Sequence, residues 1–358
     1  MQLTHSKLLL IAVLAGFALV QQAVAQSPSA ALASLPDADA LIYVSPQRIL
    51  NEAAPRVMDP AELTKARAAF ADMKKSAGVD PSTIEYLVIA VRFHKPAADL
   101  SFVAPDIMAV VGGDFSSDSL MTLGQLYLQD KVRVEKYGSK SITLMKIDPI
   151  AAQAEKNPIL KPLAEIGAVP LNANSLAIGN LRYLKSAIDA AEGGNGRISP
   201  ASLESLFRDP NALIAASGAP LASFAKSFGF MGLENTTREP RCDTPFGNFY
   251  AAVTMTGTNF TLRGAMNADN PDTAKIINNL LSGLMQQGIS SIPDKNVQTI
   301  LQALKMFARE NEIVWEADIP EKTVADFIRS QSTPKKDEQA TSSAPAKRPV
   351  RKKRTRKQ

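Results

Sequence analysis

The sequence predicts an α+β fold of two similar lobes, each a mostly antiparallel sheet packed by helices on one face. Short apolar strands alternate with amphipathic helices along the chain. Two strand pairs are separated by short turns typical of β-hairpins, which argues against a parallel, doubly wound sheet. The chain has 358 residues and is 45% hydrophobic, enough for a substantial core. We expect a first lobe at residues 35–195 and a second at 205–330.

The first lobe begins with a short strand and a well-marked helix. Asp59 is a suitable N-cap, Pro60 suits the first helical turn, and Glu62 completes a capping box. An apolar stripe then runs to Gly78, which is expected to end the helix. Strands are expected at 41–44, 84–93, 107–111, 132–137, 142–147 and 175–178. Helices are expected at 59–77, 116–128, 150–166 and 181–191.

The second lobe repeats part of the first pattern: residues 211–216 (NALIAA) echo residues 39–44 (DALIYV), which suggests a duplication. A hairpin is expected at 249–255 and 260–266, followed by a helix at 272–287 that begins at Asn270 and Pro271. We expect this helix to turn five residues inward: Ile276, Ile277, Leu280, Leu281 and Leu284. A helix at 295–309, a strand at 312–319 and a helix at 321–330 complete the lobe.

The N-terminus has the three parts of a cleavable signal peptide. Lys7 is the positive residue, residues 8–20 form an uncharged apolar run, and Ala23 and Ala25 give the small-residue pattern before the cut, so that the mature chain would start at Gln26. The run is shorter than the roughly 20 residues that a membrane-spanning helix needs. We therefore expect an exported protein, periplasmic or extracellular, with no membrane span after cleavage.

The C-terminus is a basic tail. Residues 331–358 carry a net charge of +8. With a further +1 in the leader and +5 for the whole chain, residues 26–330 are left with a net −4. The tail has too little apolar mass to fold and is expected to be disordered. Eight cations near its end form the predicted polyanion-binding segment: Lys347, Arg348, Arg351, Lys352, Lys353, Arg354, Arg356 and Lys357.

The expected partners of this tail are anionic lipid headgroups, lipopolysaccharide or another extracellular polyanion. A solubilising tail without a partner is the alternative. The single cysteine, Cys242, excludes an intramolecular disulfide, so that a bond between two chains through Cys242 is the expected route to any dimer.

No catalytic, metal-binding or cofactor-binding residue is assigned, and no cofactor is expected. The mature chain has one histidine, His94, which we interpret as a solvated residue at a strand end. One His and one Cys do not make a typical zinc set. The acids near Asn267 are better explained by helix capping than by a calcium loop. Trp315 is expected to lie in the core.

Two segments carry a resemblance to known proteins. Residues 36–44 (PDADALIYV) after a signal peptide, and residues 175–180 (SLAIGN) leading into 184–189 (LKSAID), resemble a family of exported bacterial two-lobed α+β proteins of unknown function. The resemblance covers most of residues 35–330. It implies the two-lobed fold and transfers no catalytic residue.

Three hypotheses for function are compatible with these features. The first is an exported, non-enzymatic binding or structural protein of the cell envelope whose basic tail binds polyanions. The second is an exported hydrolase with an acidic site between the lobes, which a cleft of clustered carboxylates would favour. The third is an envelope assembly or chaperone-like factor, which an exposed apolar groove would favour.

Overall fold

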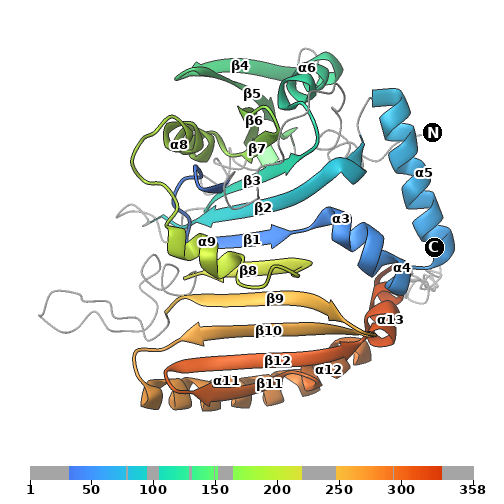
Figure 1. Ribbon diagram of the computed structural model, residues 1–358, viewed down its shortest axis with the longest axis vertical. Helices are drawn as coiled ribbons and strands as arrows, with labels where there is room; N and C mark the ends of the chain where they lie inside the picture. Colours follow the sequence, from blue (N-terminus) through green and yellow to red (C-terminus); the bar gives the residue numbers. More distant parts are fainter. Residues whose placement is uncertain are drawn as a thin grey trace, which may run out of the picture.

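The computed structural model describes residues 32–77, 80–94, 105–128, 131–148, 150–151, 164–219, 247–292 and 294–332. Within these residues, twelve strands form a single antiparallel sheet in the order β11-β12-β10-β9-β8-β1-β2-β3-β7-β6-β5-β4 (Figure 1). The α+β class with antiparallel strands is therefore confirmed.

In chain order, the strands are β1 (Ala40–Val44), β2 (Ile84–Arg92), β3 (Asp106–Gly113), β4 (Val132–Tyr137), β5 (Lys140–Lys146), β6 (Glu165–Asn172), β7 (Ser175–Gly179), β8 (Ile214–Gly218), β9 (Phe249–Thr256), β10 (Asn259–Asn267), β11 (Lys305–Arg309) and β12 (Glu312–Pro320). The helices are α3 (Pro46–Arg48), α4 (Ala54–Val57), α5 (Pro60–Ala77), α6 (Ser117–Leu128), α8 (Leu181–Ala191), α9 (Pro200–Leu206), α11 (Pro271–Ser291), α12 (Lys295–Gln302) and α13 (Glu321–Ser332). A π-helical turn, η1 (Ile49–Ala53), joins α3 to α4, and a 3-10 turn, η2 (Pro81–Thr83), precedes β2.

The two predicted lobes meet where β1 pairs with β8. This pairing runs from Ala40↔Gly218 to Val44↔Ile214, and β8 pairs in turn with β9. The backbone hydrogen bonds of the sheet therefore pass from one half of the chain to the other without a break. The division into two lobes remains a prediction drawn from the sequence pattern.

Helices cover both faces of the half of the sheet formed by β2 to β7. On β5, Ile142 and Leu144 pack in the core that contains α8, whereas Thr143 points to the opposite face, toward α6. The alternation of side chains along a strand produces these two faces. Paired residues of neighbouring strands share a face, so the register shows which helices lie on the same side of the sheet. One face carries α6, α4, α13 and α11 and is hereafter the α6/α11 face. The other face carries α8 and α9.

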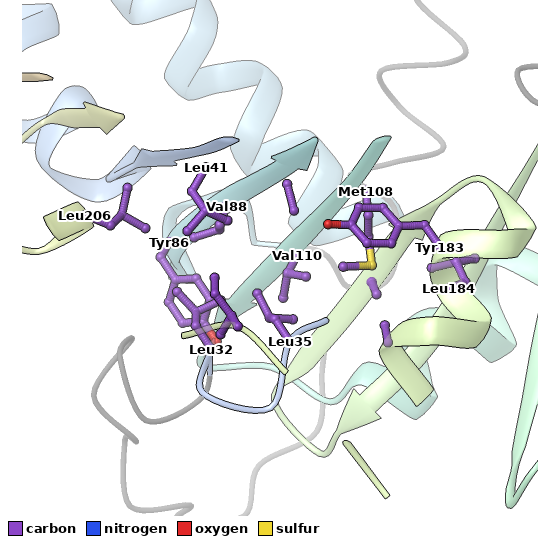
Figure 2. Packing of buried hydrophobic residues seen from close by; sticks show 14 of the residues in the cluster. Leu32, Leu35, Leu41, Tyr86, Val88, Met108, Val110, Tyr183, Leu184 and Leu206 are labelled. Carbon is purple, nitrogen blue, oxygen red and sulfur yellow. The ribbon is translucent and has the colours of Figure 1, made fainter. Parts of the chain in front are cut away.

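The main core lies under α8 and α9. Leu32 and Leu35 enter it from the segment before β1 and are fully buried beside Tyr86, Val88 and other side chains of the central strands (Figure 2). Gly112 on β3 is required here, because an added Cβ would overlap the Tyr86 ring. Aliphatic packing around a few buried tyrosines thus holds this half together, as the low aromatic content indicated.

Two elements differ from the expectation. Residues 165–172 form β6, a strand that was not predicted and that begins where the expected helix at 150–166 would end. Pro170 is accommodated at an irregularity of the β6–β7 register. Residues 305–309 form β11 rather than the last turns of a helix that started at 295. The tight turn at Glu310, whose φ is +52°, folds β11 back onto β12. The sequence has no glycine there to signal a hairpin.

The nearly continuous apolar run of residues 84–93 predicts a strand buried on both faces, but the burial of β2 alternates along the chain. Several predictions fall outside the described residues: the signal peptide, the basic tail beyond Ser332, Cys242, Gly78 and most of the helix expected at 150–166.

The β1–β8 junction makes a direct prediction about stability. Leu41 on β1 is 2% exposed in the main core, whereas its neighbour Ile42 points to the other face and is 37% exposed. Leu41→Ala is expected to lower the free energy of unfolding by about 2–5 kcal/mol, because it leaves a cavity, and Ile42→Ala by less than about 1 kcal/mol. Urea unfolding followed by circular dichroism measures both. Equal losses for the two variants would contradict the packing described.

Candidate functional site

The buried carboxylate of Asp106 is the most fully bonded polar group at the end of the strands. Asp106 begins β3 and is 2% exposed. The guanidinium of Arg182 donates to both of its oxygens, at 2.9 Å each. The side-chain amide of Asn180 donates to Oδ1, and His94 Nε2 lies 2.5 Å from Oδ2. Three side chains thus satisfy one buried charge.

Antiparallel register brings these residues together. Arg92 at the end of β2 is paired with Asp106, so His94 follows directly beside the carboxylate. Gly179 at the end of β7 is paired with Met108, which brings Asn180 and the first turn of α8 to the same place. Asn180 Oδ1 also accepts from the backbone N–H of Ile107 at 2.9 Å. The cluster therefore ties β2, β3 and α8 together.

An open depression of about 700 Å³ lies beside the cluster, lined by residues of β4, β6 and α8 together with Asp106 and Asn180. Most of its charged groups are in ion pairs, and Asp189 accepts a hydrogen bond from the Tyr137 hydroxyl at 3.0 Å. Arg133 bonds Glu165 at 2.7 Å, and Lys185 bonds Glu135 at 2.6 Å. Lys185, with Arg133, lowers the pKa of Glu135. The Lys185–Glu135 pair joins α8 to β4, and the Arg133–Glu165 pair joins β4 to β6, so we interpret this exposed network as structural.

His94 differs from its expected role. It was interpreted as a solvated strand-end residue, but its side chain is 25% exposed and contacts Asp106. Within the described residues, the interactions bring no serine, threonine or cysteine to this pair, and no group of three or more His, Cys, Asp or Glu side chains is placed to hold a metal ion. In the geometry described, His94 is one of three side chains that contact the buried carboxylate.

The acids near the β1–β8 junction bond the backbone. Asp39 Oδ2 accepts from Phe93 N at 2.7 Å, and Asp209 Oδ1 accepts from Asn211 N at 2.9 Å. The strands themselves are hydrogen-bonded along the whole described junction. The features that would favour an acidic inter-lobe site, a cleft with converging carboxylates, are not found in this described part of the chain.

Helix α11 presents an apolar surface of a different kind. Asn270 caps it by accepting from Thr273 N at 2.9 Å, and Pro271 occupies its first turn, as expected. Ala274 and Ile277 are buried against β11 and β12, and Leu281 packs beside them. On the opposite side, Ile276 is 68%, Leu280 58% and Leu284 56% exposed.

The expectation that all five apolar residues of α11 point inward was therefore wrong for these three, hereafter the α11 stripe. Residues 276 and 277 are neighbours in sequence and project about 100° apart on a helix of 3.6 residues per turn. Only one face of α11 contacts the sheet. The three residues of the α11 stripe are spaced four apart and therefore lie together on the solvent-exposed face of the helix. Residues 276–291 contain no charged side chain.

Helix α11 is joined through packing to the C-terminal helix. It contacts α12, and α12 contacts α13, which ends at Ser332 immediately before the basic tail. None of the helices in the described ranges is both long and apolar enough to cross a membrane.

The residues predicted for cleavage, Ala23 and Ala25, and for polyanion binding, Lys347 to Lys357, lie outside the described residues. Sequence reasoning missed Asp106, Asn180 and Arg182. The only available signal was an acid directly before one buried strand and an Asn-x-Arg directly after another. Without the strand order, nothing connected the two.

Comparison with known proteins adds a distant likeness at the level of structure. No family model and no curated protein matches the sequence. Among solved structures, crystal form III of TP0453 is 11% identical, with a TM-score of 0.43, and covers 86% of this chain and all of that one. Crystal form I is 12% identical, with a TM-score of 0.41, and covers 86% of this chain and 98% of that one.

Disruption of the Asp106 cluster by substitution is expected to lower the stability of the protein strongly. Asp106→Asn keeps the side-chain shape but leaves Arg182 without its counter-charge and His94 without its carboxylate partner. We expect a loss of about 3 kcal/mol in the free energy of unfolding, the low end for a broken buried pair, because Arg182 still reaches water. Glu135→Gln, on the exposed network beside it, should shift the urea midpoint much less than Asp106→Asn does. Urea midpoints measure both, and similar values for the two would refute the anchoring role.

Proposed function

We propose that this protein is an exported, non-enzymatic binding or structural protein of the cell envelope, held at an anionic lipid surface by its basic C-terminal tail and the α11 stripe. The observation that carries the proposal is the stripe itself. Three large aliphatic side chains in the charge-free part of α11, residues 276–291, are more than half exposed, which is costly in water. Exposed apolar patches of this kind mark interaction surfaces.

Further apolar residues support a lipid surface as the partner. Ile42, Ile107 and Ile214 are 37%, 39% and 39% exposed. By strand register, all three side chains belong to the α6/α11 face, the one that carries α11. Apolar side chains spread over several strands and a helix suit a bilayer better than a single small ligand.

The position of the tail provides the charge that α11 lacks. The tail follows α13, and α13 packs on α12 beside α11. Ten Lys and Arg residues follow Ser332, with two acids. A polybasic segment near a surface of anionic lipid contributes about 1 kcal/mol per cation. Stable attachment generally requires two signals, here an apolar face and a basic segment.

The polar groups of the candidate site are already hydrogen-bonded or ion-paired to one another, which supports a role without catalysis. Asp106 is paired with Arg182, and the charged groups of the adjacent depression are ion-paired or hydrogen-bonded. The signal-peptide pattern supports export. An envelope assembly factor would use the same apolar surface for proteins, and vesicle binding separates that alternative from the proposal.

Vesicle binding tests the proposal. The mature chain from Gln26 should co-sediment with vesicles containing phosphatidylglycerol and bind neutral phosphatidylcholine vesicles much less, and its binding should fall as salt rises because the tail neutralises headgroups. A form ending at Ser332 should lose most binding at physiological salt. Leu280→Ser should weaken binding by about tenfold, equivalent to about 1.4 kcal/mol of lost apolar transfer.

Phe307→Ser is the matched control. Phe307 is also partly exposed, at 39%, and lies on β11, next to α11, but its side chain points to the opposite face of the sheet. It should leave vesicle binding unchanged. Equal effects of the two serine substitutions, or full binding by the form ending at Ser332, would contradict the proposal. Failure to bind any vesicle, together with suppression of aggregation of an unfolded envelope protein, would favour the assembly factor.

A further inference from the structure

A separate apolar pocket lies between α6 and the end of the sheet. Its floor includes a row of register partners, Thr143 on β5, Ala168 on β6 and Ile178 on β7. Its roof comes from α6, including Leu120, Met121 and Gly124. The volume is about 120 Å³. The pocket is distant in the sheet order from α11, which covers β11 and β12 at the other end.

Small residues keep this space open. A Cβ added to Gly124 would meet no atom within 4 Å, so the glycine leaves room in the pocket rather than allowing a close helix contact. Ala168 is the smallest side chain of the floor row. A glycine inside a helix costs about 1 kcal/mol relative to alanine, and no positive φ requires it in α6.

The lining is apolar and its polar groups are already bonded. The side-chain amide of Gln125 donates to Thr143 Oγ1 at 2.8 Å, which satisfies the polar atoms of the floor. A water molecule needs two to four polar partners to occupy a cavity, and an engineered apolar cavity of about 150 Å³ stays dry and binds benzene. The pocket between α6 and the sheet has comparable size and similar chemistry.

The apolar surface continues beyond the pocket. Val134 on β4 is the register partner of Thr143, lies on the same face, and is 55% exposed. Strand β4 is the last strand of the sheet. A ligand longer than the pocket therefore finds an apolar path from Thr143 across Val134 toward the sheet edge.

We infer that this pocket binds the end of a single aliphatic chain, with the rest of the chain passing over Val134 at the β4 edge. The pocket accommodates only a few carbon atoms, which excludes a second chain or a ring system larger than benzene. The inference stands independently of vesicle attachment, because it concerns different residues at the opposite end of the sheet.

Binding of saturated fatty acids to the mature protein tests the inference. Calorimetry with hexanoate, octanoate and decanoate should show affinity rising about fourfold per methylene, the factor expected for burial of one CH₂, up to the length that the pocket and Val134 cover. A single-chain phospholipid with a decanoyl chain, used below its micelle concentration, distinguishes a lipid source from a free acid. Binding of both establishes that the chain is the recognised part.

Two variants locate the site. Gly124→Leu fills the pocket and should abolish decanoate binding while raising the melting temperature, since it adds packing and helix propensity. Gly283→Leu is the control: Gly283 is also a helical glycine with open space around it, on α11, and its substitution should leave decanoate binding intact. Val134→Glu should weaken decanoate binding more than hexanoate binding.

Three results would overturn the inference. The first is no binding by any fatty acid. The second is equal decanoate binding by the wild type and by a folded Gly124→Leu variant, which would mean adsorption elsewhere. The third is benzene binding with no gain from chain length, which would show a small cavity without the proposed path over Val134. Loss of vesicle binding in Leu280→Ser with decanoate binding retained would show that the two surfaces act separately.

Discussion

The pairing of β1 with β8 is the constraint on which the rest of the architecture depends. Five register pairs between these short strands unite the strands on either side into one sheet. Because the side chains of paired strands share a face, this register also decides which helices share a face. The apolar residues of the β2–β7 half that pack against α6 and the residues of the β9–β12 half that pack against α11 consequently belong to a common side. A one-residue slip at this junction would move one set to the other side.

The polar interactions of the first half serve this arrangement. A buried carboxylate is tolerated only when it is paired and hydrogen-bonded. Asp106 meets this condition because three strand ends and the start of α8 converge on it, with Arg182, Asn180 and His94 as partners. The cluster resembles a catalytic arrangement in composition, with a histidine beside an aspartate. Its bonding is that of an anchor, since each donor is directed at the carboxylate.

The apolar surfaces of the molecule are concentrated on the α6/α11 face. The pocket under α6, the exposed isoleucines of the central strands and the helix carrying the α11 stripe all belong to it. The face covered by α8 and α9 instead buries the main core (Figure 2). This division between a structural face and an apolar face open to partners is consistent with a protein that works against lipid. The two proposed modes of contact, a pocket for one chain and a broad surface for a bilayer, use different residues of this face.

The sequence by itself determined the elements whose signals are local. The helix at 181–191, the hairpin at 249–267 and the start of α11 at Asn270 and Pro271 followed from capping, periodicity and turn residues, which act within a few positions. It also determined the charge separation between tail and body. Strand β11 was not predicted because its turn at Glu310 carries no glycine. Strand β6 was not predicted because Pro170 argues against a strand.

Only the tertiary structure decided which apolar residues are buried and which polar residues meet. Ile276, Leu280 and Leu284 have the same composition and spacing as core residues, and only the position of the sheet leaves them outside. Asp106 and Arg182 are 76 positions apart in the sequence and adjacent in space. Burial and contact at such separations depend on strand order, which no local pattern encodes, because it is set by the packing of the whole chain.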